Sequence, residues 1–304
     1  MIDFENIKQL ALSKGCTVRE NEPMSRCTTF KIGGEARLML LVPTLSALKA
    51  LLKKCHEQQI PVFVLGNGSN LLVSDKGMEE VVIKLDGDFK KMTLVEDDTI
   101  YCGAAASLAS LCRYACDNGL SGLEFAWGIP GSVGGAAFMN AGAYGGEMKD
   151  VIIQANHLTP SGEHGVLSAD ELELGYRHSA YADNGCIITG ITVKLIKDSK
   201  AEISRRMDDY MQRRKDKQPL EFPSAGSIFK RPEGYFAGAL IQDCGLKGYS
   251  IGGAMVSPKH SGFIVNSGGA SCEDVMRLIE HIKSSVREKF GVELECEVRP
   301  VGRM

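Results

Sequence analysis

Apolar residues in the first part of the chain recur at helical and then at strand spacing. Residues 2–14 predict a short amphipathic helix, because their apolar side chains fall on one side and Gly15 follows. Residues 44–59 predict a second helix with Thr44 as its cap. Short apolar, β-branched runs predict strands at residues 38–42, 60–65, 81–85 and 99–104.

The same reading of the later chain gives three further helices and three strands. The helices are expected at 107–118, 201–217 and 271–290, each followed by a glycine or a polar turn. The strands are expected at 151–158, 186–195 and 292–299. Strands and helices alternate without an internal repeat, which indicates a mixed α and β protein large enough for two domains.

Composition narrows the class of protein but not its activity. The chain has 304 residues, 44% hydrophobic and 24% charged, and a net charge of −3, so no polyanion-binding surface is expected overall. The N-terminus lacks the apolar core of a secretory signal, so a cytoplasmic protein is expected. The ten cysteines are scattered without a CxxC pair, which favours free thiols over disulfides or structural zinc.

The most unusual stretch is residues 120–146, which contain eight glycines and the only tryptophan. It is too apolar for a solvated linker and too rich in glycine for a helix. Its centre, GSVGG at 131–135, could direct several main-chain N–H groups at one anion, although a glycine-rich loop that packs only against itself is the simpler alternative.

A second glycine turn, GNGSN at residues 66–70, directly follows a predicted buried strand. It is not a dinucleotide fingerprint, because Leu71 stands where GxGxxG needs glycine and a strand pattern follows instead of a helix. No GxxxxGK[ST] is present, so a P-loop ATPase is not indicated.

Three polar residues are candidates for chemistry. Ser227 and Lys230 fit S-x-x-K, but the partner motifs are missing and Pro232 follows, so a serine nucleophile of the penicillin-recognising type is rejected. A fixed hydroxyl at Ser227 could still protonate a strongly basic centre such as an enolate. Arg177 could clamp a carboxylate, and Glu297 lies in an alternating acidic segment that could equally be a solvent-facing edge.

Taken together, eight motifs resemble one family over residues 26–302. In chain order they are CTTFKIGGEAR, LGNGSNLLV, GLEFAWGIPGSVGGAAFMNAGAYGGE, GYRHSAY, PSAGSIFKRP, AGALIQDCGLKG, IGGA and LECEVRPVG. They resemble the UDP-N-acetylenolpyruvoylglucosamine reductases, which are flavoproteins of peptidoglycan synthesis. The spacing after GYRHSAY is similar to the shorter subtype, which lacks an inserted substrate-covering loop.

The resemblance implies an α+β fold. Residues 1–32 would form an N-terminal helix and a turn that contacts FAD. Residues 33–198 would form an FAD-binding domain of the vanillyl-alcohol-oxidase type, also called PCMH-type. Residues 199–304 would form an α+β substrate-binding domain.

The resemblance also implies the residues of the site. FAD, bound without a covalent link, would contact Thr28, Thr29, Ile32, Gly33, Gly34, Leu65, Gly66, Asn67, Gly68, Ser69, Asn70, Gly128, Pro130, Gly131, Ser132, Gly134, Gly135, Asn140, Gly142 and Tyr144. Tyr176 and Lys217 would bind substrate, with Arg214 and Lys215 as alternatives to Lys217. The catalytic residues would be Arg177, Ser227 and Glu297.

The implied reaction has NADPH as hydride donor and the enolpyruvyl ether of UDP-N-acetylglucosamine as acceptor. Arg177 and Glu297 would stabilise the enolate, and Ser227 would protonate it. No metal, nucleic acid or membrane partner is implied, and a monomer is expected. A flavin oxidase acting on another alcohol or sugar, and a non-catalytic nucleotide-binding module, are the alternatives.

Overall fold

The computed structural model describes residues 4–304, so the predicted helix position Ile2 lies outside the described residues. The chain divides into two compact units, each built from separate segments. The first unit comprises the chain up to Glu20, residues 38–67 and residues 80–213. The second unit comprises residues 21–37, 68–79 and 214–304. Each unit is described on its own below.

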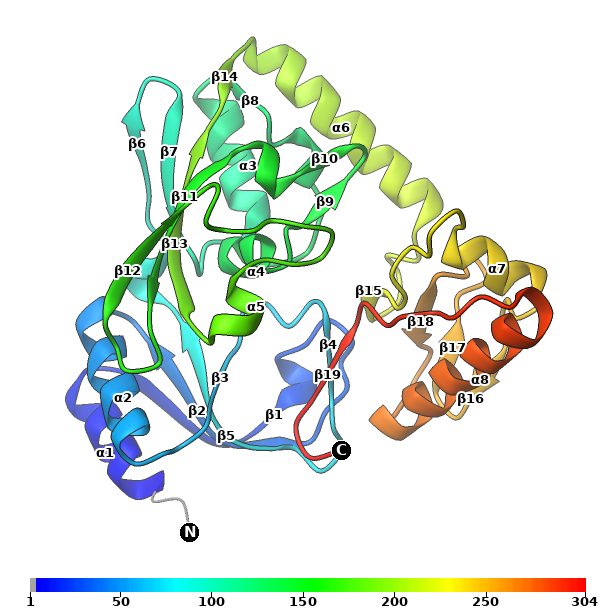
Figure 1. The fold of residues 1–304 in the computed structure, drawn as a ribbon, viewed down its shortest axis with the longest axis horizontal. Helices are drawn as coiled ribbons and strands as arrows, with labels where there is room; N and C mark the ends of the chain where they lie inside the picture. Colours follow the sequence, from blue (N-terminus) through cyan, green and yellow to red (C-terminus); the bar gives the residue numbers. More distant parts are fainter. Residues whose placement is uncertain (1–3) are drawn as a thin grey trace. The chain divides into compact units, whose positions relative to one another are not determined.

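Two sheets form the frame of the first unit (Figure 1). One has the order β1-β2-β5-β3, formed by Thr17–Pro23, Glu35–Val42, Met78–Leu85 and Val62–Val64. The unit boundaries fall within β1, β2 and β5, so each of these strands has residues assigned to both units. The other has the order β12-β11-β13-β7-β6, formed by His164–Ser168, Ile152–Leu158, Ile187–Lys194, Thr99–Gly103 and Met92–Glu96. All neighbours in this second sheet are antiparallel.

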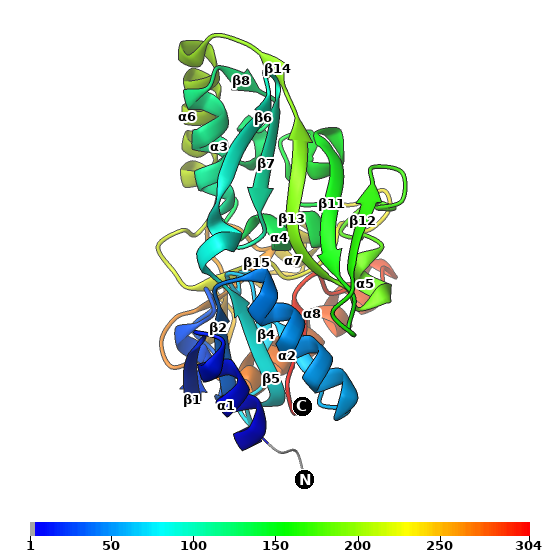
Figure 2. The same cartoon turned by 90° about the vertical axis from the view of Figure 1, so that its left-hand side faces the viewer.

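Helices and short pairs of strands complete the first unit. The helices are α1 (Phe4–Ser13), α2 (Leu45–Glu57), α3 (Leu108–Asp117), α4 (Val133–Phe138), α5 (Tyr181–Asn184) and most of α6 (Lys200–Lys217). The pairs are β9 (Gly142–Ala143) with β10 (Gly146–Glu147), and β8 (Leu120–Ser121) with β14 (Ile196–Lys197). Figure 2 shows α1 and α2 against the first sheet and α3 beside α6.

The second unit has a four-stranded antiparallel sheet and one long helix. The sheet order is β15-β18-β17-β16, formed by Ser224–Ser227, Phe263–Asn266, Ala254–Val256 and Ser250–Ile251. The helices are α7 (Ala237–Asp243) and α8 (Cys272–Phe290). A parallel pair joins β4 (Leu71–Val73) to β19 (Arg299–Val301), so residues from early in the sequence are part of this unit.

Short 3-10 turns connect these elements. They are η1 (Met24–Arg26), η2 (Gly87–Lys90), η3 (Glu124–Ala126) and η4 (Met148–Asp150). Each unit has its own hydrophobic cluster. One includes Leu48, Ile83 and Ile191, and the other includes Ile264, Val275 and Ile279. Two separate cores agree with the two-domain size estimate.

Helix ends follow the signals in the sequence closely. Thr44 and Ser107 cap α2 and α3, with their hydroxyl oxygens accepting from the amides of Ala47 (3.3 Å) and Ser110 (3.0 Å). Ser271 begins α8 in a capping box with Asp274, and Gly291 ends that helix in the left-handed region. The five helices predicted from periodicity are therefore confirmed within a few residues at each end.

The predicted strand at 292–299 is wrong. Only Arg299–Val301 forms a strand, and the preceding segment makes one isolated bridge, between Phe229 and Cys296. Its alternating residues are still divided by burial, because Leu294 and Val298 are buried while Glu293 and Glu295 are exposed. The alternation thus reflects packing against the second core and not a sheet ladder.

The described residues also bear on two expectations from composition. No helix among residues 4–304 is both long and apolar enough to cross a membrane. The described chain includes all ten cysteines, and each is a free thiol. Burial raises the pKa of the most enclosed ones, including Cys55 to about 11 and Cys102 to about 12, which makes them inert packing groups.

Candidate functional site

The two glycine-rich turns approach each other within the first unit. The hydroxyl of Ser132 caps α4 by accepting from the amide of Gly135 at 3.2 Å. A Cβ atom at Gly66 would lie only 2.6 Å from that same hydroxyl oxygen. Gly66 therefore has to lack a side chain for the 66–67 and 128–135 segments to adjoin.

Several main-chain N–H groups in these turns are available to a ligand. The amides of Val133 and Gly134 are used within the fold, since they donate to Ala106 and Ala104 at 2.9 Å each. Within residues 4–304, by contrast, the amides of residues 66–69 and of residues 131 and 132 donate to no protein acceptor. Within the first unit, the donors at residues 66, 67, 131 and 132 suit a phosphate, so the residues present there fit the diphosphate of FAD.

The predicted GYR and NAGAYG motifs also meet in the first unit. Gly175 and His178 exchange main-chain hydrogen bonds of 3.2 and 3.3 Å, so Tyr176 and Arg177 form the tip of a tight turn. The amide nitrogen of the Asn140 side chain donates to the Gly175 carbonyl at 2.9 Å. The Arg177 guanidinium lies 3.5 Å from the Gly142 carbonyl oxygen.

The Asn140 side chain links the GYR turn to the residues that follow the NAGAYG motif. Its side chain is fully buried, donates to the Glu147 carboxylate at 2.6 Å and accepts from the Lys149 amide at 2.9 Å. Every polar atom of the Asn140 amide thus has a partner inside the unit. The arrangement fixes the loop that carries Gly142 and Tyr144.

Three predicted site residues adopt a left-handed backbone conformation. Asn140, Tyr144 and Arg177 have φ angles of 42°, 54° and 56°. This conformation is mild for asparagine but costs a bulky residue of the order of 1 kcal/mol or more. Such strain at Tyr144 and Arg177 persists because the surrounding hydrogen bonds hold the two turns, and it directs both side chains.

An aromatic and cationic surface lies beside these turns. The rings of Tyr144 and Tyr210 stack with centroids 4.7 Å apart and planes within 6°. The Arg213 guanidinium lies over the Tyr210 ring at 5.7 Å, and that of Arg177 over the Tyr176 ring at 5.1 Å. Tyr176 is 53% exposed, so its ring is accessible to a ligand with a planar or polar group.

In the second unit the structure brings the segments of Ser227 and Glu297 together. The Glu297 amide donates to the Ile228 carbonyl at 2.8 Å, and the Val298 amide donates to the same oxygen at 3.3 Å. Ser227 ends β15, whose pairing with β18 is irregular and includes Gly226 at a φ of 77°. The predicted acid therefore bonds through its main chain to Ile228, the residue that follows the predicted proton donor Ser227.

Glu297 differs from the two acids that precede it. Glu293 and Glu295 are exposed and pair with Arg287 at 3.0 Å and Lys230 at 2.5 Å. Glu297 is partly buried beside the Ser227 segment. Of the two interpretations of this acidic segment, the solvent-facing edge describes Glu293 and Glu295, whereas the role of Glu297 as a site residue stays a prediction.

The predicted cofactor turn at 28–34 packs within the second unit. The Thr28 hydroxyl donates to the Ile32 carbonyl at 3.2 Å, and the Thr29 hydroxyl donates to the Ser224 carbonyl, at the start of β15, at 2.7 Å. Gly33 and Gly34 lie so close to the 73–77 segment that a Cβ at Gly34 would be 2.2 Å from the Asp75 carbonyl oxygen. Close packing, against the Val73 side chain at Gly33 and against the main chain of Asp75 at Gly34, therefore accounts for these two glycines in this unit.

The basic residues at the C-terminal end of α6 differ in their exposure to solvent. Lys217 is exposed, whereas Arg214 is buried and donates to the Gln218 side chain at 3.0 Å. The carbonyl of Lys215 accepts from the Lys259 ammonium at 2.6 Å. Of the three alternatives for a substrate phosphate, Lys215 and Lys217 are exposed and Arg214 is buried, so the choice of Lys217 stays a prediction.

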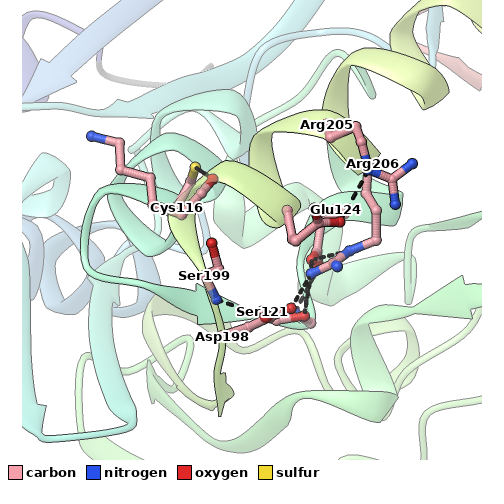
Figure 3. A network of polar contacts seen from close by, with 10 residues as sticks. Cys116, Ser121, Glu124, Asp198, Ser199, Arg205 and Arg206 are labelled. Carbon is pink, nitrogen blue, oxygen red and sulfur yellow. Dashed lines mark hydrogen bonds and ion pairs between the residues drawn. The ribbon is translucent and has the colours of Figure 1, made fainter.

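Glu124 was missed as a candidate. Figure 3 shows its carboxylate with the Arg206 guanidinium, which donates to it at 2.7 Å and to Asp198 at 2.5 Å. Ser121 and the Gly122 amide also donate to Glu124, at 2.9 and 2.7 Å. Burial raises the pKa of Glu124, but these donors outweigh burial, so its pKa lies below the ordinary value.

The sequence did contain a signal for this network. Glu124 is the only charged residue in 120–146 and lies three residues before Trp127. A single charge in an apolar stretch requires a buried partner. In the described residues 4–304, no group of three His, Cys, Asp or Glu side chains could hold a metal ion.

Comparison with known proteins identifies both halves of the chain. Residues 36–168 match the model of an FAD binding domain, and residues 218–301 match that of the UDP-N-acetylenolpyruvoylglucosamine reductase C-terminal domain. These matches lie inside the predicted ranges 33–198 and 199–304, whose outer boundaries stay a prediction.

Individual relatives cover nearly the whole chain. A UDP-N-acetylenolpyruvoylglucosamine reductase of Alkaliphilus oremlandii is 51% identical over 282 residues, 93% of this chain and 92% of the relative. The one from Syntrophomonas wolfei is 46% identical over 285 residues, covering 94% and 95%. The crystal structure of UDP-N-acetylenolpyruvylglucosamine reductase (MurB) from Thermus caldophilus matches with a TM-score of 0.81 at 39% identity, covering 94% and 98%.

These findings confirm the predicted fold class, an α+β chain with a vanillyl-alcohol-oxidase-type FAD-binding domain followed by a second α+β domain. On this basis the chain belongs to the UDP-N-acetylenolpyruvoylglucosamine reductase family.

Proposed function

We propose that this chain reduces the enolpyruvyl ether of UDP-N-acetylglucosamine to UDP-N-acetylmuramate, with NADPH as hydride donor and FAD as the bound cofactor. Membership of the reductase family and the FAD-binding domain support the proposal. The observation that carries it is the pairing of the Ser227 and Glu297 segments through the Ile228 carbonyl. When bound, FAD would supply reversible two-electron chemistry, taking a hydride from NADPH and giving it to the vinyl carbon.

The residues predicted to hold FAD would do so through the main chain. The amides of residues 66–69, 131 and 132 have no protein acceptor within residues 4–304 and can donate to the diphosphate. Thr28, Thr29 and residues 32–34 would line the cofactor from their own turn, and Asn140, Gly142 and Tyr144 would lie nearer the flavin. No lysine is needed where several amide dipoles converge.

Arg177 would bind the substrate carboxylate. Its guanidinium can make two parallel hydrogen bonds to a carboxylate, and it lies on a turn whose backbone is fixed by the Gly175–His178 pair. Negative charge grows on this carboxylate only when the double bond is reduced. An interaction that strengthens with that charge lowers the barrier and does more than tighten binding.

Ser227 would give its proton to C2 of the substrate. A hydroxyl is a weak acid, but an enolate carbon is basic enough to take its proton when the two are well placed. Glu297 would orient or protonate the enolate from the neighbouring segment. Tyr176 would contact the substrate through its exposed ring, and Lys217 would hold the UDP phosphates with its exposed ammonium.

We further infer a monomer that works in the cytoplasm on a precursor of peptidoglycan. NADPH and nucleotide sugars are both supplied in that compartment. Light scattering of the purified protein at micromolar concentration would test the monomer, and a mass of twice 32.9 kDa would refute it.

The function is tested on the purified protein in the absence of oxygen. Its visible spectrum should show a bound flavin, whose absorbance bleaches when NADPH is added. The absorbance should return when the enolpyruvyl sugar nucleotide is added, with one UDP-N-acetylmuramate formed per flavin. A colourless protein would support a nucleotide-binding module instead. Bleaching by an unrelated alcohol, with oxygen consumed afterwards, would support an oxidase.

A further inference from the structure

The segment that follows the GNGSN turn is built into the second unit at several points. Strand β4 pairs in parallel with β19, with Leu71 opposite Arg299. The Asp75 carboxylate accepts from the first amides of α8, those of Cys272 at 2.9 Å and Glu273 at 3.1 Å. Residues 68–79 therefore hold the C-terminal part of the chain at both its helix and its last strand.

Within this segment, Asn70 makes a direct hydrogen bond to Glu297. Its side-chain amide donates to the Glu297 carbonyl oxygen at 3.0 Å, and its own carbonyl accepts from the Arg299 amide at 3.0 Å. On its other side, the Glu297 amide donates to Ile228 at 2.8 Å. Glu297 is thus held between the segment of Ser227 and the side chain of Asn70.

These bonds matter because no regular sheet holds this part of the chain. Residues 292–298 lie outside any strand, so the orientation of the Glu297 peptide depends on a few single hydrogen bonds. The peptide orientation sets the direction in which the Glu297 side chain leaves the main chain. A displacement of about 1 Å at a reacting group can cost on the order of a hundredfold in rate.

We propose that Asn70 is a positioning residue for Glu297, and that its side-chain amide serves the protonation step by fixing the peptide that carries the acid. This inference rests on the proposed function. It gives Asn70 a role besides the cofactor contact expected from the glycine turn. It also makes the 66–70 turn a direct link between the cofactor-binding sequence and the acid.

The test compares three variants of the FAD-loaded protein. Asn70→Ala removes the donor, and Asn70→Asp removes it while keeping the size of the side chain. Ser74→Ala is the matched control, because the Ser74 hydroxyl also donates from this segment to a carbonyl of the C-terminal residues, that of Arg303. That bond lies at the far end of β4 from Glu297.

With FAD supplied in excess, both Asn70 variants should slow flavin bleaching by NADPH much less than they slow the step with the enolpyruvyl substrate. The return of absorbance on adding the enolpyruvyl substrate should slow by about 10- to 100-fold. The pH dependence of that return should shift in Asn70→Ala and not in Ser74→Ala. Hydrogen exchange of a peptide covering residues 292–298 should quicken in the Asn70 variants alone, which is a readout independent of activity.

A double-mutant cycle shows whether Asn70 acts through Glu297. Once Glu297→Gln has removed the acid, adding Asn70→Ala should slow the substrate step by less than about twofold further. Independent effects, in which the two losses multiply, would overturn the proposal. So would equal slowing of both half-reactions with loss of FAD, since Asn70 would then act as a cofactor ligand only.

Failure of the proposed function has a different signature. In that case the wild-type protein itself would not recover its absorbance with the enolpyruvyl substrate. Behaviour of Asn70→Ala like that of Ser74→Ala, in an active wild type, would refute the positioning role alone. If Asn70→Ala does not fold, Asn70→Asp, which keeps the shape of the side chain, carries the same comparison.

Discussion

Replacing Arg206 by alanine is the sharpest test of how the glycine-rich centre is supported. The Glu124 side chain is 8% exposed and the Arg206 side chain 32% exposed. Removing one partner of a fully buried ion pair costs roughly 3–5 kcal/mol. Since Arg206 is partly exposed and Ser121 and Gly122 still donate to Glu124, we expect Arg206→Ala to lower the free energy of unfolding by about 2 kcal/mol.

The destabilisation in Arg206→Ala should also affect the predicted cofactor loop at residues 128–135. Glu124 begins the turn whose carbonyls accept from the amides of Trp127 at 3.1 Å and, through Ala126, of Ile129 at 3.0 Å. We therefore expect weaker FAD binding as well as lower stability. Arg205→Ala is the matched control, because Arg205 is 69% exposed and pairs with exposed Glu202 at 3.0 Å. Its loss should cost less than about 0.5 kcal/mol.

The assay is unfolding in urea, monitored by the fluorescence of Trp127. This residue is the only tryptophan and lies within the glycine-rich stretch 120–146. The difference between Arg206→Ala and wild type should shrink as the pH falls through the lowered pKa of Glu124, because the carboxylate that the guanidinium stabilises is then protonated. Equal unfolding free energies for the Arg206 and Arg205 variants would refute this account of the loop.

Two further changes test the second unit. Gly68→Ala should abolish FAD retention and lower the thermal midpoint more than Gly248→Ala does. Both glycines have a left-handed φ, but only at Gly68 would a Cβ meet a main-chain oxygen, that of Cys27 at 2.3 Å. Similar midpoints would contradict this reasoning. The Ser271 amide holds the pKa of Asp274 below its ordinary value, so its stabilisation is present above about pH 4 and is lost as pH falls further. Asp274→Asn should therefore unfold more readily than wild type at pH 7. The two midpoints should converge as the pH falls through the lowered pKa of Asp274, and parallel curves would exclude the linkage.

Helices could be predicted well because their signals are local. Thr44, Ser107 and Ser271 each stand at the start of a helix whose apolar spacing spans several turns, and each caps it as expected. A cap and a periodic stripe depend on residues within one helix. No distant contact is needed to interpret them.

The division of the chain could not be predicted, because it depends on pairing between distant segments. Residues 68–79 belong with the C-terminal residues through β4 and β19, which lie more than 200 positions apart in the sequence. The sequence predicted a strand at Glu297 for a related reason. An alternating pattern of apolar and polar residues is the same whether or not the segment pairs with a neighbouring strand. The role of Asn70 follows from that long-range pairing.

The site residues came from the resemblance and not from their local pattern. Ser227 and Glu297 each had a simple structural alternative, and only their adjacency in the second unit favours joint chemistry. Arg177 lies in the first unit, so its meeting with the other two residues stays a prediction.

The central claim is that Ser227 donates the proton that completes reduction of the substrate. Its most direct test is single-turnover mixing of NADPH-reduced Ser227→Ala with the enolpyruvyl sugar nucleotide, in parallel with wild type. We predict that the variant is reduced by NADPH at the wild-type rate and that its formation of UDP-N-acetylmuramate slows by about a hundredfold or more. Product formation at the wild-type rate would contradict the account.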